Sequence, residues 1–294
     1  MPTPQPGIFA QGTLHHRHLE LDLIQGVDDA ALGSAVESLV ELFAHPGGVN
    51  LVVGFGAEAW RRIADPEDIP DGLAPFDVAG LASTQHDIWV WLHGNDAGGL
   101  FDAAYEVVHR LSPVASLASE TAGFAYHDSR DLSGFVDGTE NPGLDEAFEV
   151  AIIADGEPGA GGSFALAQRW VHDLAAFGSL DVAEQESVIG RTKLTDEELD
   201  PRPATSHLGR VVVEDEEGEE MEIYRRSVPY GGVGEHGLFF LAFSSDPQRV
   251  RVMLERMFGQ IDDGLADRLT EFSTPVSGAN YFVPAVGSLP GVTS

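Results

Sequence analysis

Apolar and polar residues alternate in several short segments of the first half of the chain. In HLELDLI (18–24), Leu19, Leu21 and Leu23 alternate with acidic residues, which predicts a strand with one buried face. The same pattern and its turn signals predict further strands and two helices. The predicted order is a helix from Asp28 to about Ala44, strands at 51–56 and 86–94, a helix at 98–111 and a strand at about 115–127.

The second half repeats this order of elements without repeating the sequence. Its predicted elements are a strand at 163–174, a helix at about 181–190, a β-ribbon around 215–218, a strand at 237–245 and a helix from Asp246. Two βαββαβ units are typical of ferredoxin-like folds with antiparallel sheets. We therefore predict an α+β protein of two such units, 1–150 and 151–294, with the glycine-rich segment 155–162 as linker. A crevice between the units would suit a large flat ligand.

Charge and composition narrow the range of functions. The 294 residues include 48 Asp and Glu against 16 Lys and Arg, a formal net charge of -32 that repels phosphate backbones and anionic lipids. We expect no nucleic-acid partner, and the acidic surface is typical of a solubility device. No stretch approaches eighteen apolar residues and no basic, apolar leader is visible, so we expect a cytoplasmic protein without a membrane anchor. The chain has no cysteine, so a metal would be bound by histidine or carboxylate.

The chemistry-bearing motif lies between the halves, in SGFVDGTENPG (133–143). Its glycines, Asn141 and Pro142 favour turns, and on composition alone the favoured interpretation is that Asp137, Thr139 and Asn141 only bond their own backbone. However, GFVDGTENP resembles the GxxDG motif of the dye-decolourising peroxidases. The segments IGRTKLTDEELD (189–200), SHLGR with His207 and YRRSVPYG (224–231), and the ending DRLTEFSTPVSGANYFVPAVGSLP, occur in that family's order. The resemblance covers essentially the whole chain and is closest to the compact type B members.

The resemblance implies that haem b (iron protoporphyrin IX) binds in the C-terminal unit, near the crevice, with His207 as the proximal iron ligand. It makes Asp137 the distal carboxylate and Arg225 the distal guanidinium, and Ser227 stands where relatives carry Asn or Ser. Asp267 resembles the acidic partner of the proximal imidazole, although Asp262, Asp263 and Glu271 lie close by. Such a carboxylate raises the basicity of the imidazole, and a permanently charged arginine stabilises developing anions at any pH.

Other charged residues are expected at the haem edge. Arg191 and Lys193 are expected to anchor the haem propionates, with Glu140 and Asn141 along the same edge. The alternative for Arg191 and Lys193 is a solvated helix end. Phe135, Leu238, Phe239 and Phe240 could cover a haem face, but such residues are more often ordinary core.

The implied activity is reduction of hydrogen peroxide and oxidation of aromatic dyes, phenols or similar one-electron donors through a ferryl intermediate. Two alternatives remain, an enzyme that processes iron porphyrin and a non-catalytic haem-binding protein; the presence of both Asp137 and Arg225 favours the peroxidase. A homo-oligomer and an encapsulin shell are further partners that the resemblance raises, the latter from a short Gly-Ser-Leu sequence near the C-terminus.

Strand alternation makes two more predictions. In MEIYRRSV (221–228), Arg225 and Ser227 should point the same way and Arg226 the other, which favours Arg226 as a surface charge. A hairpin at 215–218 would bring His207 towards Arg225, whereas the resemblance implies that the two residues lie on opposite haem faces. His207 should therefore lie in the entering loop, outside the regular ladder. His15, His16 and His18 are interpreted as a solvated strand edge and not a metal site.

Overall fold

The computed structural model describes residues 2–43, 48–215 and 217–292. The helices are α1 Asp29–Phe43, α2 Ala57–Ile63, α3 Ala97–Leu111, α4 Leu144–Ala151, α5 Leu174–Gly178, α6 Val182–Ile189, α7 His207–Val211 and α8 Pro247–Met257. The strands are β1 His15–Leu23, β2 Val49–Phe55, β3 Ile88–Gly94, β4 Ala115–Phe124, β5 Ser163–His172, β6 Tyr224–Arg225, β7 Val228–Gly231, β8 His236–Ser244, β9 Ser273–Pro275 and β10 Ala279–Val283. Short 3-10 helices span Pro6–Ile8, Pro66–Asp68, Arg268–Glu271 and Val286–Ser288.

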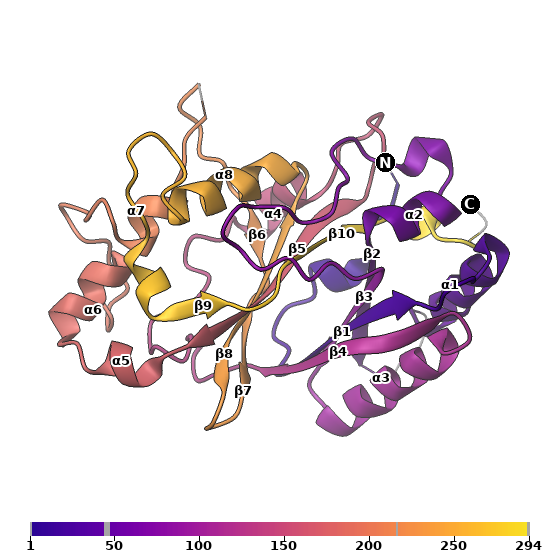
Figure 1. Ribbon diagram of the computed structural model, residues 1–294, viewed down its shortest axis with the longest axis horizontal. Helices are drawn as coiled ribbons and strands as arrows, with labels where there is room; N and C mark the ends of the chain where they lie inside the picture. Colours follow the sequence, from indigo (N-terminus) through magenta and orange to yellow (C-terminus); the bar gives the residue numbers. More distant parts are fainter. Residues whose placement is uncertain (1, 44–47, 216, 293–294) are drawn as a thin grey trace.

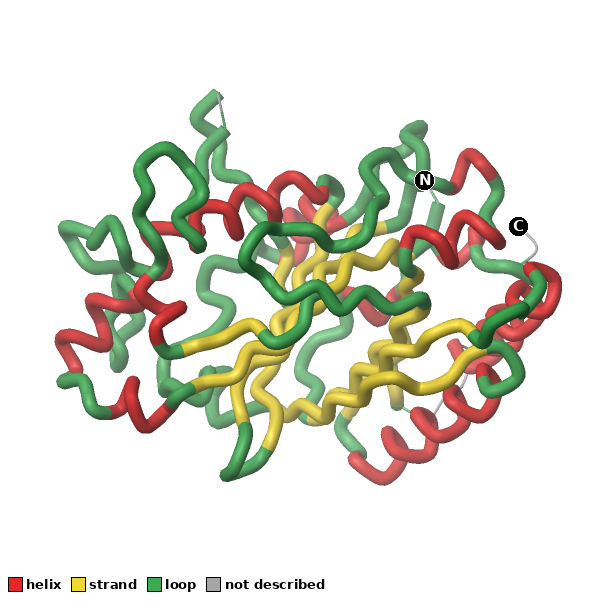
Figure 2. Tube along the Cα trace, viewed as in Figure 1, coloured by secondary structure: helices red, strands yellow, loops and turns green. Residues whose placement is uncertain are grey.

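Within the described residues, ten strands form one antiparallel sheet that closes on itself. The order is β6-β8-β7-β4-β1-β3-β2-β10-β5-β9, and an additional pairing of β5 with β8 closes eight of the strands into a barrel-like ring. The strands run through the middle of the molecule, with α5, α6 and α7 at one end and α1, α2 and α3 at the other, whereas α4 and α8 lie beside the strands (Figure 1; Figure 2). This confirms the prediction of an α+β fold with antiparallel pairing.

The two halves of the chain contribute strands in the same spatial order. The first half gives β4-β1-β3-β2 and the second gives β10-β5-β8-β7. Long ladders hold each half together, whereas the two seams are sparse: one residue pair joins β4 to β7, Gly123 with Tyr230, and one joins β2 to β10, Phe55 with Phe282. The sheet is therefore continuous, with its weakest pairing where the halves meet.

Three apolar layers stabilise this arrangement. Helices α1 and α3 cover the outer face of the first half, where Leu39 and Val107 pack against strand residues. Helix α8 covers the second half through Val250 and Leu254. Its start is capped by Asp246, whose carboxylate accepts the N–H of Gln248, and this satisfies a backbone donor that would otherwise lack a partner. Alternate side chains of the strands fill the barrel interior.

Most predicted elements are confirmed with small shifts at their ends. The first helix ends at Phe43, and its predicted end, Ala44, lies outside the described residues. The ribbon at 215–218 is reduced to an isolated bridge between Glu214 and Glu220, and residue 216 is also outside the described part. The segment 155–162 is held by backbone bonds, including those from Ile153 N–H to Gly162 and from Gly159 N–H to Glu67. Among the described residues, no helix has the length and apolar character needed to cross a bilayer.

Two local predictions are wrong. His16 and His18 do not form a solvated edge: β1 is a central strand, paired with both β3 and β4, and the two side chains are buried. The alternation of histidine with Arg17 reflects a strand with one face inside the barrel. His207 lies outside the strand ladder, as predicted, but it is not in a loop, because it is the first residue of α7, a short helix capped by Ser206.

Candidate functional site

The local fold around α7 fixes the orientation of His207. Ser206 Oγ accepts the N–H of Gly209, which caps the helix. The Nδ1–H of His207 donates to Asp267 Oδ2 at 2.7 Å, and Asp267 Oδ1 accepts the N–H of Leu269 at 2.8 Å. The side chain of Asp267 is fully buried whereas that of His207 is 30% exposed. The imidazole is therefore held by Nδ1, and Nε2 is left for a ligand in the adjoining space.

Of the acidic neighbours of Asp267, Asp263 has another partner. It forms a bidentate ion pair with the buried Arg210, at 2.8 and 3.1 Å. Arg210 also donates through Nε to the carbonyl of Arg256. These contacts attach α7 to the C-terminal end of α8 and so help to place His207.

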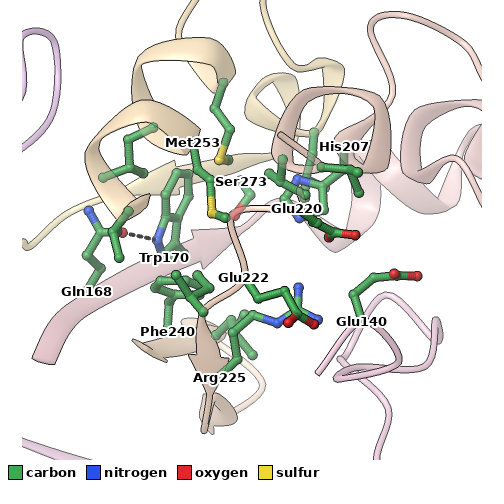
Figure 3. A pocket seen from close by; sticks show the side chains of 18 of the residues that line it. Glu140, Gln168, Trp170, His207, Glu220, Glu222, Arg225, Phe240, Met253 and Ser273 are labelled. Atoms are coloured by element: carbon green, nitrogen blue, oxygen red, sulfur yellow. Dashed lines mark hydrogen bonds between the residues drawn. The ribbon is translucent and has the colours of Figure 1, made fainter. Parts of the chain in front are cut away.

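His207 borders an apolar cavity lined mainly by aromatic and aliphatic side chains, the kind of space in which cofactors and ligands are usually bound. Met253 of α8, Trp170 of β5 and Phe240 of β8 line it (Figure 3). Met257 of α8 and Leu238 of β8 complete these walls. Glu140, Glu220, Glu222 and Arg225 supply the charged part of the lining. One face of α8 is apolar because it forms a wall of this cavity.

Asp137 and Arg225 meet at a second, polar cavity. Arg225 lines both the apolar and the polar cavity, and Ser227 and Asn141 line the polar one with them. Asp137 also lines a third cavity, beside the apolar one, which it shares with His207. The arrangement places an imidazole, a carboxylate and a guanidinium around one connected group of cavities.

The loop that carries Asp137 is docked on β6 by Asn141. The Oδ1 of Asn141 accepts the N–H of Arg225 at 2.8 Å, and its Nδ2 donates to the carbonyl of Arg225 at 2.9 Å. The N–H of Asp137 donates to the carbonyl of Ser129 at 2.9 Å. Asn141 thus couples the positions of Asp137 and Arg225, and its amide is engaged with backbone.

Burial raises the pKa of Asp137 above its ordinary value, and the charge of Arg225 partly opposes this effect. The Nε of Arg225 is buried and, among the described residues, has no hydrogen-bond partner. An unpartnered donor of a charged group costs free energy when buried, so it is expected to bond with something that enters the cavity.

Ser227 lies in the break between β6 and β7. Its Oγ accepts the N–H of Leu241 at 3.2 Å, so the hydroxyl already bonds to the backbone of β8. Arg226 is not the surface charge that alternation favoured: its guanidinium is largely buried and donates to the carbonyls of Ile8 and Ala10. Alternation correctly predicted that Arg226 points away from Arg225 and Ser227. The side to which it points is the barrel interior and not the protein surface.

The predicted cationic pair separates into two environments. Arg191 is surrounded by carboxylates: it pairs with Glu140, with Asp196 at 3.0 Å and with Glu198 at 3.6 Å. Lys193 donates to Gln185 at 2.6 Å beside the rings of Phe135 and Phe177, and desolvation lowers its pKa. Within the described residues neither cation lines the apolar cavity or its neighbour, whereas Glu140 lines the apolar one.

Sequence reasoning missed one polar group at the site. His172 lines both the apolar cavity and its neighbour, and its two nitrogens contact Asp131 at 3.1 Å and Ser273 at 2.8 Å. Although burial opposes the shift, the hydrogen bond with His172 lowers the pKa of Asp131. Asp131 lies only six residues before Asp137 in the sequence. Its partner His172 comes from β5 and Ser273 comes from β9, and only the fold brings these strands next to Asp131.

These features define a class of protein that has an apolar pocket with a possible metal ligand. The ligand is an imidazole that a carboxylate orients and that has one nitrogen available to a metal. An aspartate and an arginine line the adjoining cavities. Two family models match the chain, "Dyp-type peroxidase, N-terminal" over residues 17–125 and "Dyp-type peroxidase, C-terminal" over residues 128–288. The chain belongs to the Dyp-type peroxidase family.

Individual relatives agree with this assignment. The chain is 40% identical to a dye-decolorizing peroxidase of Rhodococcus erythropolis over 83% of this chain and 74% of that protein. It is 37% identical to a dye-decolorizing peroxidase of Mycobacterium tuberculosis, over 82% of this chain and 75% of that protein.

Solved structures are also similar over nearly the whole chain. The encapsulated DyP-type peroxidase from Mycobacterium smegmatis has a TM-score of 0.92 and 35% identity, with 100% of this chain and 99% of that chain covered. A variant of the DypB protein of Rhodococcus jostii RHA1, in complex with heme, has a TM-score of 0.89 and 33% identity, with 99% of both chains covered.

Proposed function

We propose that this chain is a haem b peroxidase that reduces hydrogen peroxide and oxidises aromatic one-electron donors. Family membership and the bond from His207 to Asp267 support the proposal most directly. In this proposal His207 Nε2 binds the iron, and the porphyrin lies in the apolar cavity of the C-terminal half, with Asp137 and Arg225 on the opposite side from His207.

The residues present fit a haem. The cavity has aromatic and aliphatic walls that suit the flat apolar faces of a porphyrin. The unpartnered Nε of Arg225 is a donor that a small oxygen ligand could satisfy. The Asp267 carboxylate fixes the tautomer of His207 and makes its Nε2 a stronger base.

When bound, the haem supplies an iron centre that can take oxidising equivalents from peroxide and pass them on singly. The chain supplies the proton handling and the charge. Asp137 accepts a proton from one peroxide oxygen and returns it to the other, and burial raises its pKa, which strengthens the carboxylate as a base. Arg225 stabilises the negative charge on the departing oxygen, and Asn141 keeps the two residues in register.

The remaining predicted residues have supporting roles in this proposal. Lys193 and Arg191 act near the propionates only if a propionate replaces some of their present partners, Gln185 for Lys193 and the carboxylates around Arg191. Ser227 contributes through its hydroxyl while accepting the N–H of Leu241.

We also propose that the two halves, 1–150 and 151–294, are ferredoxin-like units. The matching strand orders and the sparse seams between the halves support this division. A homo-oligomeric state, cytoplasmic localisation and packaging in an encapsulin shell stay predictions; the similar structure from Mycobacterium smegmatis is described as encapsulated.

One experiment separates the three functions considered. The haem-reconstituted protein is mixed with peroxide and a phenol, product formation is followed over many turnovers, and the porphyrin is recovered for mass spectrometry. A peroxidase converts many phenols per haem and returns the porphyrin intact. Iron loss or porphyrin cleavage in step with turnover would instead identify a porphyrin-processing enzyme, and haem binding without either reaction would identify a carrier.

A further inference from the structure

The interior of the barrel contains an unusual set of buried aromatic rings, which we call the interior stack: His16, His18, Trp89, Trp91 and His93. Ring centroids lie 4.0 Å apart between Trp91 and His93, 6.0 Å between His18 and Trp91, and 6.4 Å between Trp89 and Trp91. These distances correspond to direct contact between neighbouring rings. An interior built only for stability would be filled with aliphatic side chains, which have no polar atoms to satisfy.

The stack begins at the polar cavity that contains Asp137 and Arg225. His16 lines that cavity, and its Nδ1 accepts the indole N–H of Trp91 at 3.2 Å. Arg226, from the strand segment that follows Arg225, lies over the ring of Trp91 at 5.1 Å. Trp91 is thus one side chain away from the place where peroxide is expected to react.

The stack ends at a buried pair, Tyr281 and Glu20. The ring of Tyr281 lies 5.7 Å from that of Trp89, and its hydroxyl donates to Glu20 Oε1 at 2.9 Å. Tyr281 is 0% exposed and Glu20 is 4% exposed. Burial raises the pKa of Glu20 and raises the pKa of Tyr281 well above its ordinary value. A buried carboxylate with a phenol donor beside it is therefore poised to accept a proton.

We propose that Tyr281 is a one-electron oxidation site, with Glu20 as its proton acceptor and the two tryptophans as the bridge from the peroxide site. The proposal rests on the peroxidase function proposed above, which supplies the oxidant: haem that has reacted with peroxide and lacks an electron donor. An electron leaves Trp91 for the oxidised haem, Trp89 refills Trp91, and Tyr281 refills Trp89. Tyr281 becomes a neutral phenoxyl radical, and its hydroxyl proton moves to Glu20, which becomes a neutral carboxylic acid.

Electrostatics explain why the oxidation should finish at Tyr281. The fixed charge of Arg226 opposes positive charge on Trp91, and burial lowers the pKa of His16 to about 4, which makes it a poor proton acceptor. The indole N–H of Trp89 has no acceptor among the described residues. Oxidation of Tyr281 with proton transfer instead removes a buried negative charge, because Glu20 is neutral afterwards, and a medium of low polarity favours that loss of charge.

The site cannot serve large donors directly, because its rings are buried. Trp89, Trp91 and Tyr281 are all 0% exposed. The interior stack therefore stores oxidising equivalents that no donor has used. A one-electron donor that reaches the haem later would return Tyr281 and Glu20 to their starting state.

The test is freeze-quench electron paramagnetic resonance of the holoenzyme after one equivalent of peroxide without donor. The wild-type protein, with natural or ring-deuterated tyrosine, identifies a tyrosyl radical without any mutation, because deuteration narrows its signal. Tyr281→Phe should lose the tyrosyl signal, and Trp89→Phe and Glu20→Gln should strongly reduce it. Tyr105→Phe, which changes an exposed tyrosine on α3, is the matched control and should keep the signal.

Absorption spectra of the same samples separate the two proposals. A haem spectrum that changes with peroxide, together with a tyrosyl signal that disappears in Tyr281→Phe, supports both. A changed haem spectrum without a tyrosyl signal, or with one that persists in Tyr281→Phe, overturns the radical site and leaves the peroxidase proposal intact. A haem spectrum that does not respond to peroxide overturns the peroxidase proposal and the radical site with it.

Discussion

Strands β5 and β8 form a wall of two different spaces, the apolar cavity and the barrel interior. Gln168, Trp170, Leu238 and Phe240 line the cavity. The intervening residues Ala167, Phe239 and Leu241 face the barrel, where Phe239 stacks on His18 at 3.7 Å. Because successive side chains of a strand point to opposite faces, the same two strands line an apolar cavity that is open to a ligand on one face and the filled barrel interior on the other. The cavity side leaves polar groups available to a ligand, whereas the barrel side buries most of its polar groups, and only His16 and Arg226 of those named here also line the polar cavity.

The largest expected effect is loss of the cofactor from the cavity side. His207→Ala removes the proposed axial nitrogen and should lose most tightly bound haem, because both ring nitrogens of His172, the other histidine of the cavity lining, are engaged with Ser273 and Asp131. His109→Ala, at an exposed position of α3, is the control and should bind like the wild type. Haem content and Soret position of the purified variants are the measurement, and a His207→Ala protein with wild-type values would remove His207 from the ligand role.

The next effect concerns the reaction with peroxide. Arg225→Leu should slow it by about 10²- to 10³-fold, the usual cost of losing one preorganised charge-stabilising donor. Asp137→Ala should have less effect at low pH. Because burial raises the pKa of Asp137, more of the basic carboxylate form is present as pH rises, and its loss should matter more there.

Stopped-flow measurement of the first spectral change of the haem, across pH and at equal haem content, compares the two variants. If Asp137→Ala is the slower variant at every pH, the proposed order of the two residues is wrong.

The barrel interior should make the protein sensitive to acid. The folded-state pKa of His16 is about 4 and the unfolded value is about 6.5, so the unfolded chain binds the proton more readily between these pH values. The free energy of unfolding should therefore fall as pH drops below about 6.5 and stop falling near pH 4, by up to about 3 kcal/mol from His16. Urea unfolding from pH 7 to 4 measures the slope, which should be shallower in His16→Phe; an equal slope would assign the acid sensitivity to other groups.

Two neighbouring histidines of the barrel should respond in opposite ways at pH 7. Both ring nitrogens of His18 lack partners among the described residues, so His18→Phe removes two buried unsatisfied groups and should be neutral or stabilising by about 1 kcal/mol. His16→Phe leaves the Trp91 N–H without its acceptor and should destabilise by about 1–3 kcal/mol. Thermal midpoints of the two variants give the comparison; equal losses would mean that His18 has a partner in solution.

The smallest expected effect is that of Ser227→Ala. Its hydroxyl accepts one backbone N–H, a neutral hydrogen bond worth about 0.5–1.5 kcal/mol, so the peroxide reaction should slow by less than about tenfold. The same stopped-flow assay decides, and a loss as large as that of Arg225→Leu would give Ser227 a direct part in the reaction.

Local patterns predicted the elements but not how they meet. Alternation in β1 and β5 and the caps of α3 and α8 are properties of short segments, so their strands and helices could be read directly from the sequence. The sequence could not show that β1 is central, because pairing on both edges depends on β3 and β4. The histidines of β1 were therefore misplaced on a solvated edge although their alternation was evident.

The site shows the same limit. His207, Asp137 and Arg225 were found through their resemblance to family motifs. His207 and Asp267 are in contact although they lie sixty residues apart in the sequence, and no local pattern predicts such a contact. Arg191 and Lys193 lie two positions apart, yet the fold gives one a set of carboxylates and the other an amide beside two aromatic rings. Glu140 comes from the loop after Asp137 and Gln185 from α6, which composition alone could not reveal, whereas Asp196 and Glu198 follow Arg191 closely in the sequence.

The absorption spectrum of the purified wild-type protein, reconstituted with haem b, tests the central claim most directly. A porphyrin held by His207 in the apolar cavity predicts stoichiometric haem with a Soret band that changes when peroxide is added. A protein that gives no Soret band after reconstitution would contradict the assignment of the cavity to haem and of His207 to its iron.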